Sequence, residues 1–301
     1  VLAFDFGASS GRAIRAVYDG QNLNYEEIHR FENIPIEKDG HLCWDVETLL
    51  KEIHTAIQKA GTFDSLGFDT WGVDFGLLDT DGHLLANPVH YRDARTNGKP
   101  EQAAARMPAE ELYAHTGNQI MVINTLFQLL ALREQDPELL QKAAQILFMP
   151  DLFAALLGAA YGLPENRFAP IVSSGTVTGT LANGAKIIAV AGHDTQCASA
   201  AMPCAEEDAE HTAFLSCGTW SLLGTELEAP ILTAVTGRAF TILHVLGGGT
   251  KDRLLCQMTA DCCGLTVKAG PVEATALGNI MIQLKALGLL DSITQGRRLI
   301  A

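Results

Sequence analysis

The sequence is poor in long apolar runs and in basic residues. No hydrophobic stretch approaches the roughly 18 to 20 residues that cross a bilayer, so a membrane span is excluded. Lys and Arg number 21 against 35 Asp and Glu, and the net charge of −14 argues against a nucleic-acid partner, because a polyanion would be repelled. This charge does not exclude a nucleotide, which backbone N–H groups, a few cations and a metal ion can hold locally.

The sequence also lacks cysteine pairs with C-x-x-C spacing and the pattern of a signal peptide. The seven cysteines are odd in number and include no C-x-x-C pair, so neither a zinc site nor a secreted disulfide framework is expected. Most lie in apolar stretches, which favours buried, reduced thiols. Residues 1–6 have the pattern of a buried strand and lack the basic start of a signal peptide. We therefore expect a cytoplasmic protein.

What the chain does contain is an alternation of strand and helix patterns over 301 residues, enough for two domains. A helix predicted at 125–144 is interrupted near Asp136-Pro137. Short turns of similar sequence occur once in each half, either by coincidence or because the chain contains an internal repeat. The pattern predicts a mixed α/β fold, with strands at 1–6, 12–18, 23–31, 65–70, 186–191, 213–216 and 241–246 and further helices at 49–60 and 252–262.

The first chemical motif, Asp5-Phe6-Gly7-Ala8-Ser9-Ser10-Gly11-Arg12, follows the first strand. A bound phosphate needs backbone N–H groups that point inward, and glycine permits both the sharp turn and the close approach. Serine hydroxyls add donors, and an aspartate at the strand end can hold Mg²⁺ through water. A hairpin turn made of small residues has the same pattern, so the motif alone leaves both interpretations open.

The second motif is Gly192-His193-Asp194-Thr195, at the end of a predicted strand. An aspartate there costs desolvation free energy unless it is bonded or functional. In phosphoryl transfer such a carboxylate can accept the proton of the attacking hydroxyl. The alternative, compatible with the first, is that Asp194 or Thr195 caps the helix that follows.

Three weaker patterns complete the set. Residues 216–221 form a second candidate phosphate turn with Thr219 as donor, and Gly247–Gly249 leave a flat backbone for adenine or phosphate unless they only end a strand. Asp69 and Asp74 flank Trp71 in a pattern that suits a polyol, although a tryptophan is more often part of the core. Residues 90–95 are typical of a solvated charged loop.

Taken in order, these motifs resemble the FGGY carbohydrate kinases along nearly the whole chain. The ASSGR and GTWSL forms favour the rhamnulose branch, because most members have threonines where this chain has Ala8-Ser9-Ser10. The residues that carry the resemblance are Asp5–Arg12 (DFGASSGR), Asp69–Asp74 (DTWGVD), Tyr91–Gly98 (YRDARTNG), His193–Thr195 (HDT), Gly218–Leu222 (GTWSL) and Gly270–Gly278 (GPVEATALG).

The resemblance implies an α/β fold of two actin-like ATPase (ribonuclease H-like) domains with ATP and sugar in the cleft between them. We place these domains at 1–183 and 184–301. It also implies phosphorylation of L-rhamnulose at its 1-hydroxyl, giving L-rhamnulose 1-phosphate and ADP. Another ketose, fuculose or xylulose, and a non-catalytic actin-like ATP-binding sensor are the alternatives.

Each site residue carries over from its matching motif. Asp194 would be the base, and Gly72, His193, Asp194 and Thr195 would contact the sugar. Asp5 would help to hold Mg²⁺. The residues implied for ATP are Ala8, Ser9, Ser10, Gly11, Arg12 and Thr219 at the phosphates, with Gly248 and Gly249 facing the adenosine.

The chain departs from the family pattern between Thr225 and Thr241. The family has there an asparagine that contacts sugar, a glutamine that contacts ATP and helices of the second domain, none of which is recognisable. The sequence pattern also changes abruptly near 154–170 and 225–240. We therefore expect segments to be missing at both places.

Overall fold

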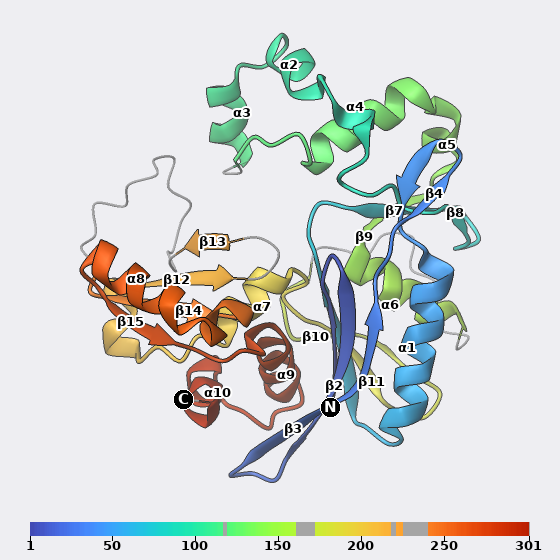
Figure 1. The fold of residues 1–301 in the computed structure, drawn as a ribbon. Coiled ribbons are helices and arrows are strands. Elements are labelled where there is room, and N and C mark those ends of the chain that lie inside the picture. Colours follow the sequence, from blue (N-terminus) through green and yellow to red (C-terminus); the bar gives the residue numbers. More distant parts are fainter. Residues whose placement is uncertain (117–118, 161–171, 218–220, 225–239, 301) are drawn as a thin grey trace.

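The structure, a computed structural model, describes residues 1–116, 119–160, 172–217, 221–224 and 240–300. A six-stranded sheet and a four-stranded sheet dominate it, and helix α7 (Asp194–Ala200) packs against strands of both (Figure 1). This is the mixed α/β architecture that the sequence predicts. None of the helices in these ranges combines the length and apolarity that crossing a bilayer requires.

The first sheet has the strand order β10-β11-β6-β1-β2-β3. Strands β1, β6 and β11 are parallel to one another, whereas β1–β2, β2–β3 and β10–β11 pair antiparallel. The strands span β1 (Leu2–Phe6), β2 (Ser10–Tyr18), β3 (Leu23–Glu32), β6 (Ser65–Thr70), β10 (Thr176–Thr180) and β11 (Lys186–Ala189).

Strand β1 is buried along its whole length, and its two faces carry different side chains. Leu2, Phe4 and Phe6 belong to the core formed with α1 (Val46–Ala60) and α6 (Met149–Ala160). Ala3 belongs to the other core, where α9 (Ala274–Ala286) packs on β1 and β6. Successive side chains of a strand point to opposite faces, which is why Ala3 lies on the other face from Leu2 and Phe4. The small Ala3 side chain leaves room for α9.

The second sheet has the order β13-β12-β14-β15. β12 and β14 are parallel, as are β14 and β15, whereas β12 and β13 form an antiparallel hairpin. In the first sheet β11, β6, β1 and β2 correspond to β15, β14, β12 and β13 in order and direction, which favours an internal repeat over coincidence. The strands span β12 (Thr212–Cys217), β13 (Ser221–Gly224), β14 (Ile242–Leu246) and β15 (Thr266–Ala269).

Smaller elements surround the sheets. The helix predicted at 125–144 is two helices, because Asp136 ends the first and its carboxylate accepts the Leu139 N–H of the second at 2.9 Å. The remaining elements are β4 (Ile36–Lys38), β5 (His41–Cys43), β7 (Phe75–Leu78), β8 (Leu84–Ala86), β9 (Gln145–Phe148), α2 (Lys99–Ala104), α3 (Ala109–Thr116), α4 (Thr125–Gln135), α5 (Pro137–Lys142), α8 (Arg253–Cys263) and α10 (Ile293–Ile300).

The boundary predicted between residues 183 and 184 falls inside the β10–β11 hairpin. Both strands of that hairpin belong to the six-stranded sheet, and β11 pairs with β6. Asn183-Gly184 is part of the turn of this hairpin, and Gly184 has the positive φ of 87° that such turns use. The change from the first sheet to the second therefore comes after β11.

Two other sequence predictions concern burial. Cys43, Cys197, Cys204 and Cys217 are buried free thiols, as predicted, whereas Cys262 and Cys263 at the end of α8 are exposed, contrary to the prediction. The prediction of a solvated loop at 90–95 is only partly right: Arg92 is exposed, but His90 and Tyr91 are each 4% exposed, because both rings pack on Trp44.

Helices α7 and α9 cross at Gly278. A Cβ on this glycine would lie 1.7 Å from the carbonyl oxygen of Cys197, so the two backbones touch directly. Because α7 begins at Asp194, this contact helps to fix the predicted base against the first sheet.

We expect Gly278→Ala to lower the free energy of unfolding by about 1–3 kcal/mol or more, because the helices must separate to admit the methyl group. Thermal unfolding measures the loss. Gly248→Ala is the matched control, since its Cβ would be 3.9 Å from its nearest neighbour. Equal melting temperatures for the two variants would contradict the proposed close crossing.

Candidate functional site

Three of the predicted motifs meet at one edge of the first sheet. β1, β6 and β11 are parallel, so their carboxyl ends lie together. The Trp71 N–H donates to the Phe6 carbonyl at 3.2 Å, and the Thr70 N–H donates to the Gly192 carbonyl at 2.9 Å. The turns that begin after Phe6, Thr70 and Ala191 are therefore neighbours.

The turn after β1 is a tight hairpin. The Gly7 N–H donates to the Ser10 carbonyl at 2.9 Å, and a Cβ on Gly11 would lie 2.2 Å from the Phe31 ring. Asn33, only 2% exposed, holds the turn from outside: its side-chain amide donates to the Gly7 carbonyl at 2.9 Å and its N–H to Ser9 at 3.0 Å. Asn33 was not among the predicted site residues, because its only local signal is a polar residue directly after a strand.

His193 and Asp194 lie at the start of α7. The N-cap residue is His193, whose Nδ1 accepts the Thr195 N–H at 3.1 Å, so the prediction of Asp194 or Thr195 as the cap is wrong. Asp194 is the first helical residue, and its Oδ1 accepts the Thr195 N–H at 2.6 Å and the Thr195 hydroxyl at 3.2 Å. The Asp194 side chain stays 36% exposed. Gly72 lies against this group, because a Cβ there would be 2.7 Å from the His193 ring.

Asp5 and Asp69 are neighbours on β1 and β6 in the same register, and both are buried. Burial raises the pKa of Asp5, against the opposing effect of Arg12. Burial and the nearby Asp5 raise the pKa of Asp69 well above its usual value. Asp69 Oδ2 accepts the Asn279 side-chain amide at 2.6 Å, whereas buried Oδ1 has no hydrogen-bond partner among the described residues. An acidic pair with an orphaned oxygen fits a nearby divalent cation or water.

Trp71 belongs to the core, as the more common interpretation predicts. It is 6% exposed and its ring centroid lies 4.0 Å from that of Trp44. Asp74 is 1% exposed and joins both indoles: it accepts Trp44 Nε1 at 2.7 Å, Trp71 Nε1 at 3.0 Å and the Gln128 amide at 2.8 Å. The Asp74 carboxylate therefore orders the turn at residues 71–74, and its burial argues against the expected contact with a polyol.

Between Gly72 and Asp74, Val73 takes a positive φ of 69°. This left-handed conformation is costly for a β-branched residue, by about 1–3 kcal/mol. Two donors from α4 hold the Val73 carbonyl: the Thr125 hydroxyl at 2.8 Å and the Gln128 amide at 3.3 Å. The turn that places Gly72 beside His193 is thus held in a strained conformation by α4, a helix that begins about 50 residues later in the sequence.

In the second sheet the glycine turn follows β14. Gly247 has a φ of 81°, its N–H donates to the Pro271 carbonyl at 3.1 Å, and a Cβ on Gly249 would lie 2.4 Å from Cys217 Cβ. Gly248 and Gly249 therefore lie beside the end of β12, where the predicted second phosphate turn begins. Thr219, the predicted donor of that turn, lies outside the described residues.

Two segments of the chain match models of known protein families. Residues 1–159 match the N-terminal domain of the FGGY family of carbohydrate kinases, and residues 231–287 match its C-terminal domain. The first match alone spans more than half of the chain.

Curated relatives of similar sequence are bacterial rhamnulokinases. The rhamnulokinase of Bacteroides thetaiotaomicron is 30% identical over 455 aligned positions, which cover 100% of this chain and 93% of the relative. That of Enterobacter sp. strain 638 is 29% identical over 451 positions, covering 99% and 92%. Because this chain has 301 residues, each alignment contains internal positions of the relative that have no counterpart here. The expectation of missing segments is thereby supported, although their predicted places fall largely outside the described residues.

Solved structures with the same fold include two proteins from Lactobacillus acidophilus. A gluconate kinase matches with a TM-score of 0.78 at 13% identity, and a xylulose kinase with 0.77 at 11%, each covering 100% of this chain and 92% of the other. The similarity confirms the two-domain actin-like fold, and at these identities it says nothing of the sugar.

The Trp44–Asp74–Trp71 group generates a prediction about pH. Burial raises the pKa of Asp74 to about 6, although the four N–H donors around it act in the opposite direction. We expect the intrinsic tryptophan fluorescence to change with a midpoint near pH 6, and Asp74→Asn to remove that transition. Because the folded-state pKa lies above the unfolded one, the stabilisation is complete below about pH 4 and is lost as the pH rises through about 6.

Fluorescence titration and melting temperatures at pH 5 and 7.5 measure both effects. Asp81→Asn, at an exposed position, is the control and should keep the transition. A transition that persists unchanged in Asp74→Asn would exclude Asp74 as its source.

Proposed function

Because this chain belongs to the FGGY family of carbohydrate kinases, we propose that this ATP-dependent kinase phosphorylates L-rhamnulose at its 1-hydroxyl, giving L-rhamnulose 1-phosphate and ADP. The substrate rests on the rhamnulokinases that align along the whole chain. The single structural observation that carries the reaction is the partly exposed Asp194 carboxylate beside the turns after β1 and β6. We place the reaction in the cytoplasm, where ATP is available.

Asp194 is proposed as the base. Its contacts with Thr195 and with His193 Nδ1 all involve Oδ1, so Oδ2 is left to accept the proton of the sugar hydroxyl. The Thr195 N–H holds the carboxylate in one orientation, which shortens the search for a reactive geometry. Gly72, His193 and Thr195 surround it and would contact the sugar.

The phosphates are proposed to lie along the hairpin turn, bound by Ala8–Arg12. Thr219, Gly248 and Gly249 would complete the nucleotide site from the second sheet. Asp5 would hold Mg²⁺ near these phosphates, and the bound ion would neutralise part of their negative charge. The buried carboxylate pair and the orphaned Asp69 oxygen are the observations that support a cation here.

A coupled ADP-release assay with ATP, Mg²⁺ and a panel of ketoses tests the substrate. We expect selective turnover of L-rhamnulose over fuculose and xylulose, since small differences in pocket contacts decide between sugars. Turnover of another ketose would overturn the substrate and keep the kinase. No turnover with any sugar, while ATP still binds, would favour the non-catalytic ATP-binding alternative.

Asp194→Asn should lower turnover about a thousandfold while leaving ATP affinity within about twofold, because an amide cannot accept the proton. Steady-state kinetics and calorimetric titration with ATP separate the two effects. Asp291→Asn, an exposed aspartate away from the strand ends, serves as the control. Turnover close to that of the unchanged protein would remove Asp194 from the role of base.

A further inference from the structure

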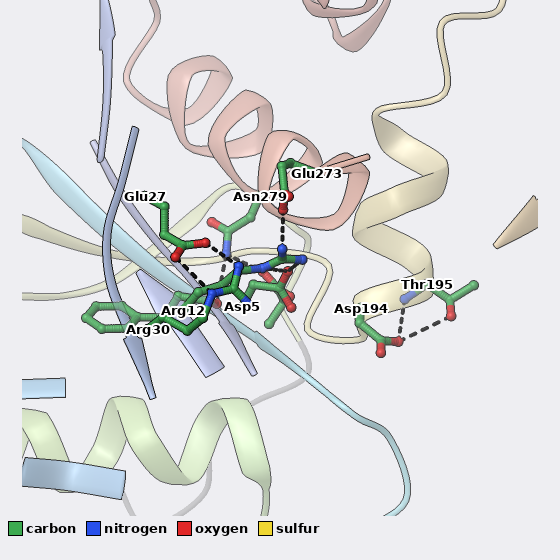
Figure 2. A network of polar contacts seen from close by, with 10 residues as sticks. Asp5, Arg12, Glu27, Arg30, Asp194, Thr195, Glu273 and Asn279 are labelled. Atoms are coloured by element: carbon green, nitrogen blue, oxygen red, sulfur yellow. Dashed lines mark hydrogen bonds and ion pairs between the residues drawn. The ribbon is translucent and has the colours of Figure 1, made fainter. Parts of the chain in front are cut away.

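The guanidinium of Arg12 is shared by two carboxylates from different elements (Figure 2). Arg12 lies opposite Asp5 in the β1–β2 register, and its Nε and Nη2 donate to Asp5 Oδ2 at 3.0 and 2.7 Å. Its remaining nitrogen, Nη1, forms an ion pair with Glu273 at the start of α9. Burial opposes its charge, yet the carboxylates around Arg12 raise its pKa.

Glu273 occupies the N-cap position of α9 without capping it, since its side chain accepts no N–H of the first turn. N-cap positions favour Ser, Thr, Asp and Asn, whose short side chains reach those N–H groups. The Glu273 carboxylate instead extends to Arg12. Local helix stability therefore does not account for a glutamate at this position.

Helix α9 is fixed to the first sheet by buried amides. Asn279 donates to the Gly67 carbonyl at 3.1 Å and to Asp69, and Gln283 donates to the Leu2 carbonyl at 3.0 Å. The Ser65 hydroxyl donates to Gln283 Oε1 at 2.7 Å. These contacts give Glu273 a defined place relative to β1 and β6, and so relative to Asp5 and Arg12.

The segment before α9 is fixed in turn to the second sheet. The Gly270 N–H donates to the Val245 carbonyl at 2.7 Å, and the Pro271 carbonyl accepts the Gly247 N–H at 3.1 Å. Residues 270–273 thus contact the glycine turn at one end and Arg12 at the other. These are the two places that the proposed function assigns to opposite ends of ATP.

We propose that Glu273 is a positioning residue for the nucleotide. It acts through Arg12 to set the distance between the hairpin turn of Ala8–Arg12 and the glycine turn of Gly247–Gly249. The inference rests on the proposed placement of ATP between these turns. Glu273 itself need not touch the nucleotide: it orients the Arg12 guanidinium and ties it to the segment that holds Gly247.

Glu273→Gln keeps the size of the side chain and removes its charge. We expect the KM for ATP and the Kd for ADP to rise about tenfold, with the KM for the sugar unchanged, since a charge-assisted contact is lost only on the nucleotide side. Glu27→Gln is the matched control: it removes the neighbouring Glu27–Arg30 ion pair on β3, which lies at the surface. The control should change neither constant.

A double-mutant cycle with Arg12→Gln shows whether Glu273 acts through Arg12. We expect the double variant to bind ADP no more weakly than Arg12→Gln alone, because the two residues form one unit. Additive losses would overturn the mechanism through Arg12. A lower melting temperature for Glu273→Gln with unchanged ADP affinity would overturn the positioning role and leave only a structural one.

Calorimetric titration with ADP separates this inference from the proposed substrate, because it needs no sugar. An unchanged protein that binds ADP but phosphorylates no rhamnulose would contradict the substrate, and the comparison of Glu273→Gln with Glu27→Gln would still decide the role of Glu273. An unchanged protein that binds no ADP would overturn the placement of ATP and with it the inference.

Discussion

Parallel pairing of β1 with β6 and of β6 with β11 brings three chain reversals to one edge of the first sheet. Segments distant in sequence, those after Phe6, Thr70 and Ala191, become neighbours by this pairing, because each follows the carboxyl end of its strand. Helix α9 protects the arrangement on one face, through Asn279 and Gln283, which bond to the backbones of β6 and β1. Movement of any of the three strands would therefore disturb the other two turns.

The same arrangement concentrates negative charge. The charge of Asp194 helps to raise the pKa of Asp5 and of Asp69, and Arg12 donates hydrogen bonds to Asp5. Burial raises the pKa of both carboxyls, and repulsion from neighbouring carboxylates raises it further, so a cation bound nearby would stabilise their charged forms. In the proposed function this cation would be the Mg²⁺ that accompanies ATP, so the net charge of −14 does not by itself oppose nucleotide binding.

The sequence predicted the elements well where periodicity and turn residues agree. Strand β6 matches its predicted bounds, since an apolar run begins at Ser65 and ends at a Gly-containing turn. Long-range polar partners were out of reach: Asn33 lies 26 residues from Gly7, and Asn279 lies 210 residues from Asp69. The sequence does contain one signal for α9. Asn279 and Gln283 are four residues apart in an apolar helix, and this spacing places both amides on one face.

The strained conformation of Val73 makes the geometry of the site depend on α4 as well as on the strand ends and α7. The conformation of its turn is held by the Thr125 hydroxyl and by Gln128, both on α4, whereas the proposed chemistry lies on strand ends and α7. Changes in the first turn of α4 can thus reshape the surface beside His193 without replacing any residue that reacts. The shape of the surface beside Gly72 and the carboxylate of Asp194 therefore depend on different elements, so a substitution on α4 can alter the first while leaving the second in place.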